Sequence, residues 1–322
     1  ASYNTAVGAN ALNANTTGTN NVAVGANAGD SITTGSDNTA LGRNALQAAT
    51  TTSNNTAIGN NALYSCTGAD NIAIGRYAAM LTTSANNNVV MGTNAFYTNT
   101  TGANNTSIGH NTLNQNTTGT TNVALGSYAL DANTTASYNT AVGDSALTTN
   151  TTASHNTAIG RAALYENTTG GNNVAVGSDA LRKNTTASNN TALGFEALKE
   201  NTTGIRNTSL GGSALSSNTT GGANTAVGKD ALAQNTTASN NTAVGSFVLD
   251  ANSTGASNTA VGTEALTANT TGSNNSAIGV SALAINTTGY ESIAIGNGAL
   301  YANTTGYRNT GIGYNVLNQN TT

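Results

Sequence analysis

The sequence predicts an all-β protein: a parallel β-solenoid of 19 coils with a 17-residue repeat, which runs as one continuous array over residues 1–322. Three observations favour this fold. One motif recurs at a fixed interval along the whole chain, and each copy contains a short alternating segment typical of a β-strand. The composition is also unlike that of a globular domain, since only 7% of the residues are charged and neither Pro nor Trp occurs.

The repeat is marked by a glycine that follows a large aliphatic residue. This glycine occurs 19 times with a 17-residue period, and the one exception is the 16-residue step from Gly59 to Gly75. The repeat with 16 residues lacks one residue at Cys66–Gly68, where the usual Asn-Thr-Thr-Gly is shortened. This segment is therefore predicted to be a turn. A repeat of this length is too short for a pair of helices and fits one solenoid coil of two short strands and two turns.

The residues around the glycine predict a strand and a core. The residue before it is aliphatic (pre-glycine column), the residue three before it is mostly Thr, Val or Ile (strand-start column), and the residue between them is nearly always Ala (middle column). The fourth residue after the glycine is Leu in 16 of 19 copies (leucine column). We expect the pre-glycine and leucine columns to face inward. The predicted core residues are Val7, Leu12, Val24, Leu41, Ile58, Ile74, Met91, Ile108, Leu125 and Val142.

The pattern opposes two other interpretations. The recurring Ala-Leu pair favours a helix, but the Gly, Thr and Asn residues in every repeat would end any helix after about two turns. Low charge and few aromatic residues are also found in disordered chains, which, however, need no regular placement of apolar residues.

Two columns of Asn are predicted to bond one coil to the next. The residue four before the glycine is Asn in 18 of 19 copies (first asparagine column), and the residue seven after it is Asn in 15 copies (second asparagine column). Stacked amides in register can form ladders. The first ladder is expected to begin with Asn4, Asn21, Asn38, Asn55, Asn71 and Asn88.

Composition excludes several kinds of partner. A net charge of −4 over 322 residues gives no basic surface, so no nucleic acid is expected as a partner. No apolar run reaches the length of a membrane span, and one cysteine cannot form a disulfide within the chain. Because Ala1 and the C-terminus both fall within the repeat, we expect a segment of a longer fibre.

No constellation of catalytic or metal-binding residues is visible. His110 and His155 replace ordinary polar residues in variable columns, and Cys66 has no histidine in its coil. The sequence therefore predicts a protein that is not an enzyme and has no cofactor. Ala and Gly fill so many constant positions that the core of one chain is thin, which predicts a homo-oligomer, most simply a trimer.

The motifs "NTAVG", "NVAVG" and "NIAIG", followed by "AL", resemble the head repeats of trimeric autotransporter adhesins, the YadA-like family, and related repeats of phage tail fibres. The resemblance extends over every repeat, although the 17-residue coil and the Asn-Thr-Thr-Gly turn depart from the family pattern. It implies a left-handed parallel β-roll with three chains around one axis on a cell or virion surface.

We therefore expect a non-enzymatic structural rod or fibre, extracellular or on a cell or virion surface. Its variable outward columns are candidates for adhesion to a surface or a glycan receptor. Ice binding is an alternative, because flat arrays of Thr on solenoids bind ice. Two observations oppose ice binding. Thr16 and Thr17 are adjacent, so their side chains point to opposite faces, and the Thr of the strand-start column is expected to lie on the same face as the buried aliphatic residue.

A glycan-coated fibril is the other alternative. Asn-x-Thr is the acceptor sequence for N-glycosylation, and it recurs in the second asparagine column, on a turn that we expect to face outward. The candidate attachment sites are Asn15, Asn99, Asn116, Asn133, Asn150, Asn167, Asn184 and Asn201.

Overall fold

The computed structural model describes residues 1–321, and Thr322, the last residue of the predicted array, lies outside the described residues. The described part contains no helix, and each repeat contributes one short strand. The strands follow one another with the 17-residue period of the sequence and mark about 18 coils. The prediction of an all-β parallel β-solenoid is confirmed.

The structure divides into two compact units, Ala1–Ala158 and Ile159–Thr322. The strands of the N-terminal unit are β1 (Thr5–Val7), β2 (Val22–Val24), β3 (Thr39–Leu41), β4 (Thr56–Ile58), β5 (Ile72–Ile74), β6 (Val89–Met91), β7 (Thr106–Ile108), β8 (Val123–Leu125) and β9 (Thr140–Val142). Strand β10 (Thr157–Ile159) falls at the division. The C-terminal unit contains β11 (Val174–Val176), β12 (Thr191–Leu193), β13 (Thr208–Leu210), β14 (Thr225–Val227), β15 (Thr242–Val244), β16 (Thr259–Val261), β17 (Ser276–Ile278), β18 (Ile293–Ile295) and β19 (Thr310–Ile312).

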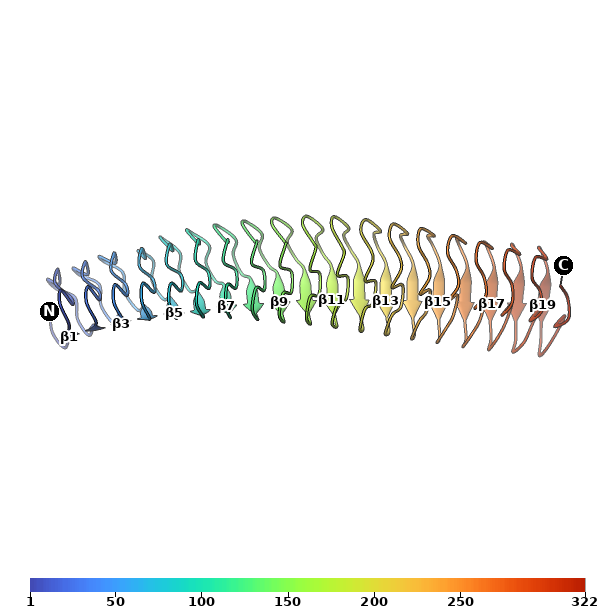
Figure 1. Cartoon of the computed structure of the whole chain (residues 1–322), viewed down its shortest axis with the longest axis horizontal. Helices are drawn as coiled ribbons and strands as arrows, with labels where there is room; N and C mark the ends of the chain where they lie inside the picture. Colours follow the sequence, from blue (N-terminus) through green and yellow to red (C-terminus); the bar gives the residue numbers. More distant parts are fainter. Residues whose placement is uncertain (322) are drawn as a thin grey trace. The chain divides into compact units, whose positions relative to one another are not determined.

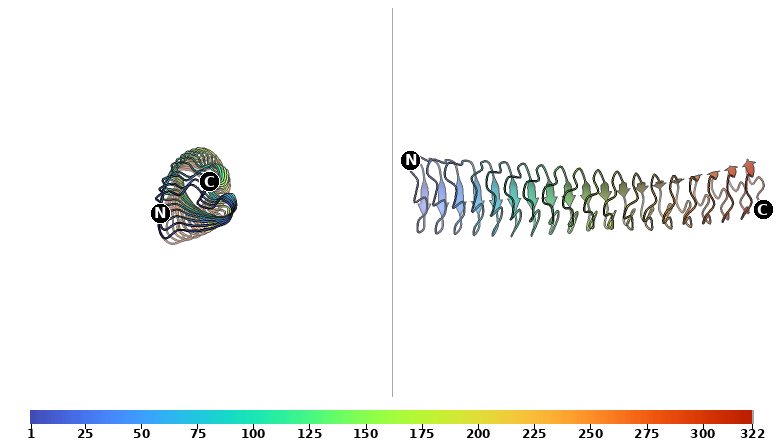
Figure 2. Two further views of the ribbon diagram at one scale, coloured as in Figure 1. Left: turned by 90° about the vertical axis from the view of Figure 1, so that its left-hand side faces the viewer. Right: turned by 90° about the horizontal axis from the view of Figure 1, so that it is seen from above.

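Within each unit, each strand pairs in parallel with the next, and equivalent residues of consecutive repeats are neighbours, as Ala6 and Ala23 are (Figure 1). Within each unit, the two further views show each coil following the path of the one before it (Figure 2). The 16-residue coil keeps this register, because Ala57 still pairs with Ala73. The residue missing at Cys66–Gly68 is therefore absorbed outside the strands, in a segment without regular structure.

Each coil has one strand, where the sequence predicted two, because the rest of the coil is made of turns. Every Leu of the leucine column has φ between 48° and 55°, in the left-handed region. This conformation costs roughly 1–2 kcal/mol for a residue with a side chain. The repeat glycines have φ between 127° and 141°, and a Cβ on Gly109 would lie 2.5 Å from the carbonyl oxygen of Gly126. Only glycine fits there.

The interior of a coil is narrow and is filled by the leucine column, the middle column and both asparagine columns. In the third coil, for example, Ala40 and Leu46 are at most 1% exposed. The interior of the stack is therefore mostly Leu, Ala and Asn, and it has no room for a second large aliphatic side chain in each coil.

The predicted inward direction of the pre-glycine column is wrong. Leu12 lies in the interior, but the other predicted core residues point outward from their strands because the small middle residue occupies the inner side. Val7, Leu41, Met91 and Leu125 are exposed, and Val24, Ile58, Ile74, Ile108 and Val142 are half-buried.

Exceptions in the core columns compensate one another. In the second repeat the leucine column has Gly29, and Ile32, which replaces the Asn of the second column, fills the space: a Cβ on Gly29 would meet its Cδ1 at 2.9 Å. In the fifth repeat Ala79 takes the place of Leu, and Phe96, the largest fully buried side chain, follows in the next coil. Core volume is thus conserved across neighbouring coils.

The predicted asparagine ladder is confirmed in the first column. The backbone N–H of Asn21 donates to Asn4 Oδ1 at 2.8 Å, and Asn21 Nδ2 donates to the carbonyl oxygen of Gly35 at 2.8 Å. The same bond to the preceding side chain is made by Asn38, Asn55, Asn71, Asn88 and Asn105. Each Asn of this column therefore bonds to the coil before it through its backbone N–H and to the coil after it through its side-chain oxygen.

The second asparagine column forms an amide-to-amide ladder. In the N-terminal unit, Asn116 Nδ2 donates to Asn99 Oδ1 at 3.0 Å and to the carbonyl oxygen of Gly119 at 3.1 Å. Residues other than Asn interrupt this column from Ile32 to Thr82. As a result the buried Oδ1 of Asn15 has no hydrogen-bond donor, because Ile32 cannot provide one.

We expect Asn218→Ala to lower the free energy of unfolding by about 2–4 kcal/mol. The substitution removes the two hydrogen bonds that Asn218 donates, to Asn201 Oδ1 and to the carbonyl oxygen of Gly221, and it takes from Asn235 Nδ2 one of its two acceptors. Urea denaturation followed by circular dichroism measures the loss. The exposed neighbour Thr220 provides the control, Thr220→Ala, which should change stability by less than about 0.5 kcal/mol. Equal effects of the two substitutions would contradict a stabilising ladder.

Candidate functional site: the outer faces of the coils

Two outer surfaces differ from the plain polar turns. The first is the strand face, formed by the outward side chains of the strand-start and pre-glycine columns. It leaves an aliphatic side chain exposed in most coils of both units, for example Val22 at 40%, Leu41 at 44% and Leu193 at 43%. An in-register series of exposed aliphatic side chains is unusual on a chain without a partner.

The second surface is the variable face, formed by the first, second, fifth and sixth residues after the repeat glycine. Its charged residues include Arg43, Arg76, Arg161 and Lys229, which are exposed, as the sequence predicted for these columns. Partial burial raises the pKa of Asp131, against the opposing effect of His110. Burial and the neighbouring charge of Asp230 raise the pKa of Asp250.

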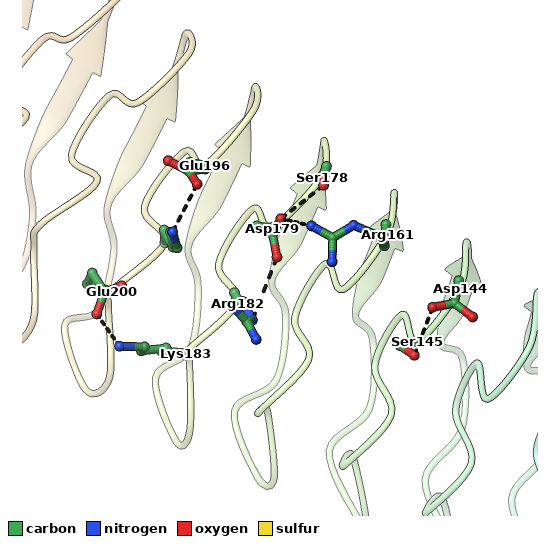
Figure 3. A network of polar contacts seen from close by, with 10 residues as sticks. Asp144, Ser145, Arg161, Ser178, Asp179, Arg182, Lys183, Glu196 and Glu200 are labelled. Atoms are coloured by element: carbon green, nitrogen blue, oxygen red, sulfur yellow. Dashed lines mark hydrogen bonds and ion pairs between the residues drawn. The ribbon is translucent and has the colours of Figure 1, made fainter.

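In the C-terminal unit, the variable face has a network of ion pairs (Figure 3). Asp179 is almost fully buried beneath Arg161, with which it forms an ion pair, and its Oδ1 lies 3.6 Å from Arg182 Nε. Lys183 pairs with Glu200 of the next coil at 2.5 Å. A further pair, Lys199 with Glu196, lies within one coil at 2.9 Å. These contacts join four cationic side chains to three carboxylates, so most of the charge is compensated within the network.

In the N-terminal unit, the variable face has an aromatic cluster and a cavity of about 310 Å³ lined by Tyr77, Asn94, Tyr97 and Asn114. The two tyrosine rings meet edge to face, with centroids 6.3 Å apart. His110 lies edge to face with Tyr128 at 5.4 Å on the same face. The sequence predicts exposed surface at these positions and gives no sign of the cavity, because each residue is ordinary in its own column.

The candidate glycan sites of the second asparagine column point inward. Asn99, Asn116, Asn133, Asn150, Asn167, Asn184 and Asn201 are fully buried, and only Asn15 is half-buried. The expected outward turn is therefore wrong, because the column lines the interior and its amides bond to one another. Asn-x-Thr also occurs one residue before the first asparagine column, at Asn54, Asn104, Asn189 and Asn240, where the Asn is exposed. The sequence pattern contained these sites, but their exposure became clear only from the structure.

We expect that the folded protein, secreted from a eukaryotic host, carries N-glycans only at exposed sites such as Asn104 and none at Asn116. An amide that is buried and already donates two hydrogen bonds cannot remain in place once a glycan is attached. Peptide mass spectrometry before and after enzymatic deglycosylation reports the occupancy of each site. A glycan at Asn116 in soluble, folded protein would contradict the buried ladder.

The residues most often used in catalysis lie apart from one another. Cys66 is a free, buried thiol, and burial raises its pKa to about 11, which disfavours the nucleophilic thiolate at neutral pH. His155 stacks on Tyr138 with ring centroids 5.1 Å apart. Residues 1–321 contain no group of three side chains suited to holding a metal ion. No helix in this part of the chain is long and apolar enough to cross a bilayer.

No protein family model matches the chain, and no curated protein matches it significantly. The resemblance to trimeric autotransporter heads and phage tail fibres therefore stays a prediction.

Proposed function

We propose that the chain is a structural, non-enzymatic part of an extracellular fibre or of a projection on a cell or virion surface. Copies of the chain associate through the strand face, most simply as a trimer. The observation that carries the proposal is the aliphatic series on that face. The surface location and a left-handed winding rest on the resemblance of the repeat motif.

The energetics favour association. Full burial of a Val, Ile or Leu side chain contributes about 1.5–3 kcal/mol. About 40% of such a side chain is exposed in most coils. Six coils of each unit have such a side chain on the strand face, and covering these would yield on the order of 4–7 kcal/mol for each unit. This gain is comparable with the roughly 4–15 kcal/mol that association costs, so an interface along both units would be favourable.

The composition of the strand face points to a second copy of this chain as its partner. Its residues are Thr, Ser, Val, Ile, Leu and Met, without a charge in any coil. Depletion of charge is typical of the buried centre of an interface. Identical coils repeated at one spacing also present the same surface to each copy.

The double substitution Leu193→Lys and Leu210→Lys should convert the oligomer to monomers, because it places two charges in each copy of a dry interface. Light scattering after size-exclusion chromatography measures the mass. The matched control carries Thr203→Lys and Thr220→Lys on the exposed turn column of the same coils and should stay oligomeric. A wild-type chain that is a stable folded monomer would refute the proposal.

Ice binding is a second candidate, because the structure removes one of the two objections to it. The strand-start Thr and the pre-glycine aliphatic residue do share a face, but this face points outward. In the C-terminal unit, consecutive coils align Thr191, Thr208, Thr225, Thr242 and Thr259 in register. A regular array of hydroxyl and methyl groups then lies in one strand face.

If the strand face binds ice, purified protein should show thermal hysteresis, and Thr225→Lys with Thr242→Lys should abolish it by breaking the regular array. The control substitutions Thr203→Lys and Thr220→Lys should leave it unchanged. Osmometry on growing ice crystals measures the effect. The two candidates compete for one surface, so an oligomer without hysteresis supports the fibre and excludes ice binding.

A further inference from the structure

The cavity on the variable face of the N-terminal unit arises where a third series of asparagines is interrupted. The second residue after the glycine is Asn in the first four repeats, and the side chains of Asn10, Asn27, Asn44 and Asn61 bond to one another at 2.9–3.1 Å. Tyr77 takes this place in the fifth repeat. The series is broken there, and the amides beyond the break are free to bind something else.

Two aromatic rings form the walls of the cavity. Tyr77 and Tyr97 come from consecutive coils, and their ring planes meet at 86°. The guanidinium of Arg76 lies over one face of the Tyr77 ring, 5.3 Å from its centroid. Both tyrosines are half-buried, and each offers a ring and a phenolic hydroxyl to a ligand.

Two amides supply the polar groups of the cavity. Asn114 Nδ2 donates to the backbone carbonyl oxygen of Asn94 at 2.8 Å, which fixes the Asn114 side chain. Thr98 Oγ1 donates to the carbonyl oxygen of Asn114 at 2.8 Å and holds its backbone. The side-chain amide of Asn94 makes no hydrogen bond to any other described residue. The cavity thus offers an unused donor and acceptor side by side.

The chemistry of these four residues suits a neutral sugar. None of them is charged, and a cavity of about 310 Å³ lies near the lower limit for small-ligand sites. The paired donor and acceptor of an amide match neighbouring hydroxyl groups, and an aromatic ring packs against the apolar face of a pyranose. The net charge of −4 disfavours polyanions such as nucleic acids.

We propose that Tyr77, Asn94, Tyr97 and Asn114 form a binding site for a neutral hexopyranose unit of a glycan. The tyrosine rings contact the apolar face of the sugar, and the amides of Asn94 and Asn114 bond to its hydroxyl groups. The site lies within one chain and apart from the strand face, so it does not depend on the proposed assembly.

Saturation-transfer difference NMR tests the site with maltose, cellobiose, lactose and N,N′-diacetylchitobiose at millimolar concentration, and with adenosine as a flat, non-sugar probe. We expect transfer to at least one disaccharide and at least a tenfold weaker affinity in Tyr77→Ala and in Tyr97→Ala, since stacked aromatic side chains dominate such sites. Tyr301 occupies the same position of its repeat as Tyr97 and is exposed. Tyr301→Ala is therefore the matched control and should bind as the wild type does.

Circular dichroism shows whether the variants keep the fold, as expected for half-buried side chains on an outer face. Absence of transfer to all four disaccharides would overturn the proposal. Transfer that survives both tyrosine substitutions, or transfer to adenosine alone, would overturn it as well. None of these results depends on the mass of the oligomer.

Discussion

The hydrogen bonds between consecutive coils are the interaction on which the rest of the structure depends. A coil encloses one large aliphatic side chain and a few small residues, so burial alone cannot offset the conformational entropy that is lost when a whole repeat becomes ordered. The backbone of each coil therefore bonds to the next, and both asparagine columns add side-chain bonds inside the stack. Because most of these bonds join neighbouring coils, an ordered coil favours the ordering of the next.

These bonds also offset a conformational cost that recurs in every coil. The leucine column holds a branched side chain in the left-handed region, at roughly 1–2 kcal/mol for each residue. In this conformation Leu130 points into the interior while its backbone N–H donates to the carbonyl oxygen of Ala146 in the next coil at 3.0 Å. The tight turns are thus retained because they place both the side chain and the backbone where the stack needs them.

The period, the parallel strands and the first asparagine ladder could be predicted from the sequence, because each leaves a strict column of residues. Which side chains of the strand face the interior could not be predicted from the alternation alone, because a period of two residues looks the same whichever face is buried. The residue types that replace one another in each column indicate better which column is buried. The middle column varies only among small residues such as Ala23, Ser107 and Gly311, apart from Val90, as expected for a confined interior. The strand-start column exchanges Thr5 for Val22, which a buried site tolerates poorly. The cavity beside Tyr77 could not be predicted, because it depends on residues from three different coils.

The shortened segment at Cys66–Gly68 shows that a solenoid tolerates the loss of a single residue and the loss of a whole repeat in different places. A single residue can be gained or lost only between strands, where the strands on either side keep their register, as Ala57 and Ala73 do. A whole repeat, in contrast, can be inserted or removed anywhere within a stack, because equivalent positions of neighbouring coils then still stack on one another. Recombination between near-identical repeats in the gene would therefore change the reach of the protein in discrete steps, without altering the cross-section that its partners recognise.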